Sequence, residues 1–223
     1  YGTNTSTTGS VEKWFDYLEK PDEMNWDGNL EIELPEYPDV TFRWYPEKMD
    51  AVTGNEVTQL YTGMPIWNTY FCDLTGDGFP DLCSTLTIGS GIIDSRIIVY
   101  DYANGASYTL EDRGKYDYSL RLNETDGCLW VVKKAYNSDD IVASGKLLFA
   151  DNCLRVAYTL YETHKFTSVT IRNDGEDTLR ITIGSDEKDL AVGEETSLAY
   201  TDFALRTIKL SSFGELDYTV TYD

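Results

Sequence analysis

The sequence predicts a mainly β protein: an antiparallel β-sheet or sandwich domain with one N-terminal helix, followed by a small second β-sandwich. Three observations lead to this fold class. Runs rich in β-branched and aromatic residues alternate between apolar and polar positions, which is the period of a half-buried strand. Asn-Gly and Asp-Gly pairs stand between several of these runs, as they do in hairpins. Residues 164–223 then change in character and carry turn signals of their own.

The first predicted element is a helix over about residues 10–20, in the stretch SVEKWFDYLEK. Ser10 can cap its N-terminus and Pro21 stops it. The apolar residues that recur at helical spacing are Val11, Trp14, Phe15 and Leu18. We interpret Trp14 and Phe15 as core anchors rather than as a binding stripe.

Strands follow almost without interruption. The predicted strands are LEIEL (30–34), VTFRWY (40–45), VTQLY (57–61), PIWNTYFC (65–72), LCSTLTI (82–88), RIIVYDY (96–102), SYTLE (107–111), YDYSLRL (116–122), CLWVVKKAY (128–136), IVASGKLLFA (141–150) and LRVAYTLYET (154–163). Turns are expected at Asn104-Gly105, at Asp126-Gly127 and at NSDD (137–140). Connections this short indicate antiparallel pairing.

The C-terminal segment is expected to be a separate unit. Asn173-Asp174-Gly175 predicts a hairpin between two strands, and Val192-Gly193-Glu194 predicts a turn before the next strand. Over residues 166–200 the segment resembles immunoglobulin-like sandwiches, in which a strand ending in N-x-G precedes L-x-I and a later G-E turn. The expected organisation is a polar linker and helix (1–22), a main β domain (23–163) and an Ig-like sandwich (164–223).

Acidic residues dominate the charge: Lys and Arg number 18 against 39 Asp and Glu, for a net charge of −21. Nucleic acid is excluded as a partner, because phosphate binding needs clustered cations and none cluster here. An anionic membrane surface is disfavoured for the same reason. The excess of acid is expected to form a solubilising surface, with cation binding as the alternative reading.

No apolar run approaches the ~18 residues that span a bilayer, so we expect no membrane insertion by this chain. The chain opens with YGTNTSTTGS, which we interpret as a flexible linker that followed a signal or membrane segment. We therefore expect an extracytoplasmic protein, either secreted or anchored at the cell surface. A membrane tether in a longer protein is compatible with this reading.

The stretch DLTGDGFPDLC (73–83), which we call the acidic loop, has the highest concentration of potential metal ligands in the chain. Its oxygen donors alternate around a glycine turn, a spacing that wraps a hard cation. The donors are Asp73, Thr75, Asp77, the carbonyl of Phe79 and Asp81. An EF-hand would add a glutamate at position 12, but that position is Ser84. A β-turn of Asp and Gly without metal is the alternative reading.

These nine residues resemble the calcium loop of the FG-GAP and VCBS repeat families, D-x-[NT]-x-D-G-x-x-D between two strands. The resemblance implies Ca²⁺ held as a structural clip by Asp73, Thr75, Asp77, the Phe79 carbonyl and Asp81. Those families repeat the unit to close a propeller, whereas a single copy is found here, so that fold is not implied. Three carboxylates without a bidentate glutamate suggest weak binding, with a Kd on the order of 10⁻⁴–10⁻³ M.

A wider block, from about residue 25 to residue 160, resembles an extracytoplasmic domain of unknown function. It includes PEYPDVTFRW (35–44), the acidic loop, GSGIIDSR (89–96) and ASGKL (143–147). That domain ends membrane metallopeptidases of the β-lactam sensor-transducer type and also occurs in related secreted proteins. The peptidase itself needs H-E-x-x-H, which this chain lacks, so the resemblance implies no catalytic activity.

The remaining candidates for catalysis are few. The single histidine, His164, lies in YETHKFTS at the expected boundary and is interpreted as a turn residue. The glycines of GSGIIDSR lack a following helix to bind an anion, so Asp94 and Arg96 are read as a strand-edge pair or a loop-ordering contact. A chance pair of carboxylates is certain among 39 acids and therefore decides nothing about glycoside hydrolysis.

Four cysteines occur without any C-x-x-C pair, which disfavours a zinc site; they are Cys72, Cys83, Cys128 and Cys153. Cys72 and Cys83 flank the acidic loop and could face each other across a hairpin. Free buried thiols are favoured for this pair, and the disulfide state stays open.

The favoured function is a non-catalytic extracytoplasmic sensory or interaction module with a structural calcium-type loop and an unidentified protein or glycan ligand. The first alternative is a carbohydrate-binding or adhesion module that uses exposed aromatics, for which the candidates are Trp44, Tyr45, Trp67 and Tyr70. The second alternative is a hydrolase with an unrecognised carboxylate pair. An exposed coplanar row of aromatics would favour the first alternative, and a deep cleft with two facing carboxylates would favour the second.

Overall fold

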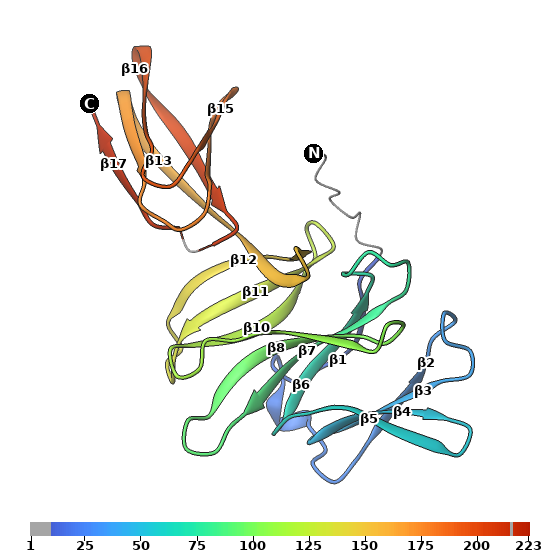
Figure 1. Ribbon diagram of the computed structural model, residues 1–223. Helices are drawn as coiled ribbons and strands as arrows, with labels where there is room; N and C mark the ends of the chain where they lie inside the picture. The colour runs from blue at the N-terminus through green and yellow to red at the C-terminus, as the bar shows by residue number, and fades with distance from the viewer. Residues whose placement is uncertain (1–9, 215) are drawn as a thin grey trace. The chain divides into compact units, whose positions relative to one another are not determined.

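The computed structural model describes residues 10–214 and 216–223, and within them the chain is built from antiparallel β-strands (Figure 1). The prediction of a mainly β antiparallel protein is confirmed. The polar tract at residues 1–9 lies outside the described residues. The chain divides into two compact units: unit 1 runs to Ala143 and adds Phe149–Leu154, and unit 2 comprises Ser144–Leu148 and Arg155–Asp223. The expected boundary at 163/164 falls inside one long strand, β13 (Cys153–Asn173).

Unit 1 contains two complete antiparallel sheets and the first two strands of a third, eight-stranded sheet. The four-stranded sheet is a meander in the order β2 (Leu30–Glu33), β3 (Thr41–Tyr45), β4 (Lys48–Thr53), β5 (Glu56–Thr62). The five-stranded sheet has the order β1 (Glu12–Asp16), β6 (Ile66–Cys72), β7 (Asp81–Ile88), β8 (Asp94–Asp101), β9 (Ala106–Leu110). The hairpin of β10 (Tyr116–Asn123) and β11 (Cys128–Ala135) packs through β10 against β7 and β8. Strand β4 has no counterpart in the sequence-based prediction.

The predicted N-terminal helix is wrong. Residues 12–16 form β1, which pairs with β6, and the only helical turn among the described residues is the 3-10 turn Pro21–Glu23. A register shift between Lys13 and Phe15 places a bulge at Trp14, so that two consecutive aromatic rings both reach the core. Trp14 stacks on Phe71 with ring centroids 5.7 Å apart. The bulge brings two consecutive aromatic side chains to the core, and for this reason the apolar positions have the spacing of a helix. The interpretation of both rings as core anchors is confirmed.

The core of unit 1 collects aromatic and aliphatic side chains from both sheets. Its buried members are Phe15, Met24, Leu34, Tyr37, Val40, Phe42, Trp44, Met49, Ala51, Tyr61, Ile66, Phe71, Leu82 and Leu86. Burial of an apolar side chain of this size contributes roughly 1.5–3 kcal/mol. Strand β7 contributes Leu82 and Leu86 to this core. The acidic loop leads into the first residue of β7, and the loop Gly89–Ile93 follows its last residue.

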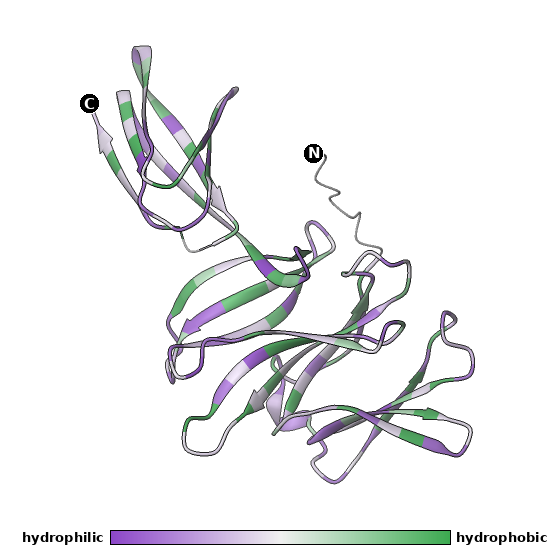
Figure 2. Ribbon diagram, viewed as in Figure 1, coloured by the Kyte–Doolittle hydropathy of each residue, from purple (hydrophilic) through white to green (hydrophobic). Residues whose placement is uncertain are grey.

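Unit 2 is an antiparallel β-sandwich-like unit with its own core. Its strands are β13, β14 (Leu179–Ile183), β15 (Asp186–Leu190), β16 (Glu195–Ser212) and β17 (Tyr218–Tyr222), while β12 (Ile141–Ala150) lies partly in each unit. Figure 2 shows hydrophobic residues alternating with hydrophilic ones along these strands. The inward residues are Phe166, Val169, Ile171, Leu179, Ile181, Ile183, Leu190, Ile208 and Leu210.

The predicted hairpin at Asn173-Asp174-Gly175 is also wrong. β13 pairs with β16 and β17, whereas β14 pairs with β15 and β16, so β13 and β14 are not paired through that turn. The buried Asn173 side chain instead donates from its Nδ2 to the carbonyls of Asp177 and Leu190. The turn at Val192-Gly193-Glu194 is confirmed between β15 and β16, with Gly193 at a φ of 75°.

Candidate functional site

The acidic loop connects β6 to β7, and its ends are fixed by the last pair of that hairpin, Cys72 with Asp81. The Asp73 carboxylate organises the first turn: its Oδ1 accepts from the Gly76 amide at 2.7 Å and its Oδ2 accepts from the Gly78 amide at 3.0 Å. Gly76 and Gly78 have φ values of 80° and 93°, a left-handed conformation that glycine adopts without strain. The loop is therefore closed by bonds from its own backbone to its own carboxylates.

Asp81 is the buried member of the loop, with a relative exposure of 1%. Its Oδ2 accepts from the backbone amides of Leu74 and Thr75, each at 2.8 Å, and its Oδ1 accepts from the Thr75 hydroxyl at 3.2 Å. Burial raises the pKa of Asp81 to about 6, the three hydrogen bonds oppose that rise, and the charge of Asp101 adds to it. Desolvation disfavours the ionised form and the hydrogen bonds favour it, so the raised pKa means that desolvation is the larger of the two effects.

Neighbouring segments hold the outer side of the acidic loop. The Asn104 side chain, in the turn between β8 and β9, donates from its Nδ2 to Asp77 Oδ2 at 2.7 Å and to Asp101 Oδ2 at 2.9 Å. The Tyr37 hydroxyl donates to the Pro80 carbonyl at 3.1 Å, and its ring stacks on Phe79 with centroids 5.9 Å apart. The link to Asn104 has no local sequence signal, because that residue lies 27 positions beyond Asp77.

The donor types of the acidic loop fit a hard cation, since carboxylate, hydroxyl and carbonyl oxygens are the ligands that Ca²⁺ takes. An ionised carboxylate has about four lone-pair sites, so its bonds to amides leave acceptor capacity. In the structure, the carboxylates of Asp73 and Asp81 accept hydrogen bonds from backbone amides of the loop itself. Among the described residues, no three Asp, Glu, His or Cys side chains gather in a way that could hold a metal.

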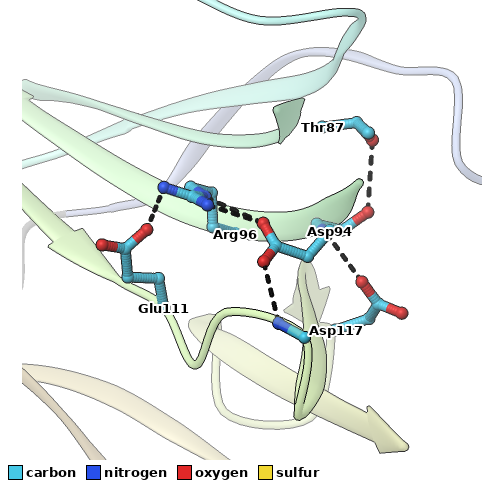
Figure 3. A network of polar contacts seen from close by, with 7 residues as sticks. Thr87, Asp94, Arg96, Glu111 and Asp117 are labelled. Atoms are coloured by element: carbon cyan, nitrogen blue, oxygen red, sulfur yellow. Dashed lines mark hydrogen bonds and ion pairs between the residues drawn. The ribbon is translucent and has the colours of Figure 1, made fainter. Parts of the chain in front are cut away.

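A second polar network lies at the opposite end of β7 (Figure 3). Asp94, which is buried, accepts at Oδ1 from both Arg96 Nη2 at 2.7 Å and Arg96 Nε at 3.2 Å. Arg96 also pairs with Glu111, and the Gly114 amide donates to Asp94 Oδ2 at 3.2 Å. The Ser95 amide donates to Asp117 Oδ1 at 2.7 Å. Asp94 and Arg96 therefore do pair, at the start of β8, and Asp94 also holds the loop that contains Gly114, so both expected readings of the pair apply.

This network frames the loop Gly89–Ile93 between β7 and β8. A Cβ added to Gly89, whose φ is 138°, would lie 1.9 Å from the carbonyl oxygen of Ile92, so the turn is closed too tightly for a side chain. Ile92 and Ile93 are 42% and 57% exposed at its tip. The turn before β6 lies beside it, because the Met64 amide donates to the Thr87 carbonyl at 2.7 Å, and Met64 is 78% exposed. We call Met64, Ile92 and Ile93 the apolar tip.

The four aromatic residues that the sequence put forward for a sugar platform do not form an exposed row. Trp44 and Tyr70 are buried, and Tyr45 and Trp67 are half-buried. The indole nitrogen of Trp44 donates to the Ile66 carbonyl at 3.2 Å, and that of Trp67 donates to the Thr87 hydroxyl at 2.8 Å. Their polar atoms are thus used inside the fold.

No family model, curated protein or solved structure matches this chain. The assignment of a function therefore depends on the geometry described above and on the resemblances in the sequence. Within the described residues, no helix has the length and apolarity needed to cross a bilayer.

His164 lies in the middle of β13, paired with Arg206 of β16, so the expectation of a turn residue is wrong. Its Nε2 lies 3.6 Å from Glu162 Oε2, and its ring lies 4.4 Å from that of Tyr222. Glu162 accepts the hydroxyls of Tyr218 and Tyr222, each at 2.6 Å. Burial acts to raise the pKa of Glu162, but the two hydroxyls and His164 hold it below its ordinary value. No local sequence signal marks this cluster, because Tyr218 and Tyr222 lie 56 and 60 positions beyond Glu162.

Proposed function

We propose that this chain is a non-catalytic extracytoplasmic interaction module that binds a protein partner through the apolar tip of unit 1. The observation that carries the proposal is the exposure of Ile92 and Ile93 on the loop that precedes the Asp94–Arg96 pair, with Met64 exposed on the turn that bonds to Thr87 at the end of β7. Exposed apolar side chains on loops held by a rigid scaffold are typical of binding surfaces.

The rigidity of the support matters for this reading. The loop spans only five residues between the last pair of β7 and β8, Ile88 with Asp94. A turn that is already ordered loses little conformational entropy on binding, so more of the apolar contact energy appears as affinity. A loop that became ordered only on binding would lose part of this contact energy to its own ordering.

The chemistry beside the apolar tip indicates the kind of partner. Ile92 lies against Gly114, whose Cβ position would be 3.2 Å from Ile92 Cγ2. Arg113 and Lys115 flank that glycine and are exposed. Two cations beside an apolar tip, in a chain of net charge −21, complement an apolar segment bordered by carboxylates.

The experiment is a selection of displayed peptides on the purified chain, with counter-selection on the Ile93→Asp variant. The expected binders combine apolar residues with flanking Asp or Glu, and Ile93→Asp weakens their binding at least about tenfold, the effect of losing about 1.4 kcal/mol. Raising salt weakens the same binders, because the flanking cations contribute through charge. Val57→Asp is the matched control, since Val57 is equally exposed, at 55%, on β5.

Two results would contradict the proposal: binders that tolerate Ile93→Asp as well as Val57→Asp, or no enrichment over an unrelated acidic protein. Applying the same chain to a glycan array tests the carbohydrate alternative. A glycan that binds the wild type and Ile93→Asp equally would favour that alternative over a protein partner. The burial of Trp44 and Tyr70 gives the carbohydrate reading no support from the aromatics named for it.

The calcium clip is part of the same proposal. Ca²⁺ would be held by Asp73, Thr75, Asp77, the Phe79 carbonyl and Asp81, at the end of β7 opposite the apolar tip. The support consists of the oxygen donor set and the resemblance of the nine residues to calcium loops. In this role the ion stabilises the β6–β7 connection and takes no part in a reaction. The extracytoplasmic location and the Ig-like assignment of unit 2 are supported by the sequence resemblances.

The hydrolase alternative requires two carboxylates free to face a substrate. A depression of about 250 Å³ beside the acidic loop is lined by Glu12, Glu36 and Asp73 among others. Glu12 and Glu36 are both exposed, so the depression is not the deep cleft with two facing carboxylates that the hydrolase reading requires. We therefore favour binding over hydrolysis for this end of unit 1.

A further inference from the structure

We propose that Cys72 and Cys83 form a thiol–disulfide modification site that staples β6 to β7 at the base of the acidic loop when a low-molecular-weight disulfide is the oxidant. The inference is independent of the apolar tip and of Ca²⁺. It concerns two thiols that none of the preceding roles uses.

The register of the β6–β7 hairpin brings these two side chains together. Cys72 is paired with Asp81 and Cys83 with Tyr70, so the two cysteines are diagonal neighbours on the same face of the hairpin. Both are buried free thiols, and their Sγ atoms lie 3.7 Å apart in hydrogen-bond contact. A disulfide needs about 2.05 Å between the sulfurs, so forming it here requires both side chains to rotate and the diagonal strand positions to move closer together.

The other two cysteines do not share this arrangement. Cys128 is buried with its Sγ 3.4 Å from the Asp126 carbonyl, and Cys153 is exposed with its Sγ 3.1 Å from the Ala150 carbonyl. Each of these thiols contacts a backbone carbonyl of its own turn. Proximity therefore selects one pairing among the four cysteines.

The chemistry is two successive exchanges. One cysteine, as its thiolate, attacks a sulfur of the small disulfide; a mixed disulfide forms and one small thiolate leaves and takes up a proton. The second cysteine thiolate attacks the protein sulfur of the mixed disulfide, so that the Cys72–Cys83 bond forms and the second small thiol is released. The two protein thiols lose two electrons in total, and the small disulfide gains them as it becomes two thiols.

Burial determines when this exchange can happen. Both thiols are buried at the base of the acidic loop. A disulfide in solution therefore cannot reach either sulfur while the hairpin is closed. Exchange proceeds while the acidic loop is open or during folding, and the bond formed is then shielded from reductant by the same burial.

The experiment refolds the full chain in a mixture of oxidised and reduced glutathione and counts thiols under denaturing conditions. We expect the number of free thiols to fall from four to two, with a mass loss of about 2 Da and a peptide map that links Cys72 to Cys83. The oxidised chain should melt roughly 5–10 °C above the reduced chain, since the bond closes a loop of about a dozen residues.

Variants identify the pair. The Cys128→Ser/Cys153→Ser double variant should still lose two free thiols. In the Cys72→Ser variant, the Cys83 thiol should have no protein partner and should form no disulfide within the chain. The wild-type peptide map needs no variant to fold, so it decides the question even if Cys72→Ser is unstable. Four free thiols after equilibrium refolding of a chain with native circular dichroism, or a map that links Cys128 to Cys153, would overturn the inference.

Discussion

At the scale of the residue, Asp81 shows how one carboxylate couples the fold to pH. It is nearly inaccessible, yet it closes the acidic loop by accepting from the amides of Leu74 and Thr75 and from the Thr75 hydroxyl. Its pKa of about 6, against an ordinary value of 3.8, means that the folded chain holds this proton more tightly than the unfolded chain does. Burial without a cationic partner is the cause.

The sign of the pH dependence follows from that difference. Because the pKa is raised in the folded state, the contribution of Asp81 to stability is fully present below about pH 4 and is lost as the pH rises through about 6. We predict that the Asp81 carboxyl resonance titrates by NMR with a midpoint near 6 in calcium-free buffer. We also predict that Asp81→Asn flattens the fall in unfolding free energy between about pH 4 and pH 7. A midpoint near 4 would contradict both expectations.

At the scale of the element, the acidic loop joins β6 to β7 and contacts the turn after β8 through Asn104. We predict that adding about 10 mM Ca²⁺ stabilises the chain by roughly 1.4–2.7 kcal/mol, given the weak binding expected of such a loop. The measurement is the melting temperature with Ca²⁺ and with chelator. The shift should shrink below about pH 6, because Ca²⁺ takes the ionised form of Asp81.

Two variants separate ligation from packing in this element. Asp77→Ala should abolish the shift produced by Ca²⁺, because it removes a proposed ligand. Asn104→Ala removes the hydrogen bond that Asp77 Oδ2 receives but leaves the ligand in place, so it should lower the melting temperature while keeping the shift. Equal melting curves with Ca²⁺ and with chelator for the wild type would show that the loop is a metal-free turn.

At the scale of the whole molecule, each unit has a core of its own, and the tryptophans divide between the units in a useful way. All five tryptophans lie in unit 1; they are Trp14, Trp26, Trp44, Trp67 and Trp130. Tryptophan fluorescence therefore reports the unfolding of unit 1 alone, whereas circular dichroism reports both units. This difference makes the independence of the two cores measurable.

We predict that the two signals respond differently to core mutations. Phe166→Ala removes a fully buried ring from the core of unit 2 and should destabilise that unit by about 3–5 kcal/mol, leaving the fluorescence midpoint unchanged. Leu82→Ala, in the core of unit 1, should lower the fluorescence midpoint at a cost of about 2–5 kcal/mol. Urea unfolding followed by both signals is the measurement. Coincident shifts for both variants would mean that the chain unfolds as one cooperative unit.

The sequence by itself determined the β class, the positions of most strands and the turns at Asn104-Gly105 and Asp126-Gly127. These features are local, because a period of two and a glycine in a left-handed turn are set by residues a few positions apart. It also marked the acidic loop and the Asp94–Arg96 contact, each confined to a short stretch of chain. Their calcium and binding roles stay predictions.

Tertiary structure decided what depends on distant partners. Trp14 and Phe15 have the spacing of a helix, yet pairing with β6, more than fifty residues away, makes their segment a bulged strand. Asn173-Asp174-Gly175 has the composition of a hairpin turn, but β13 pairs with β12, β16 and β17 and not with β14. The Glu162–Tyr218 contact and the exposure of Ile93 were equally inaccessible to local reasoning. Strand pairing is a choice among distant segments of similar propensity, and the shared core settles that choice because only one pairing buries all the apolar faces together.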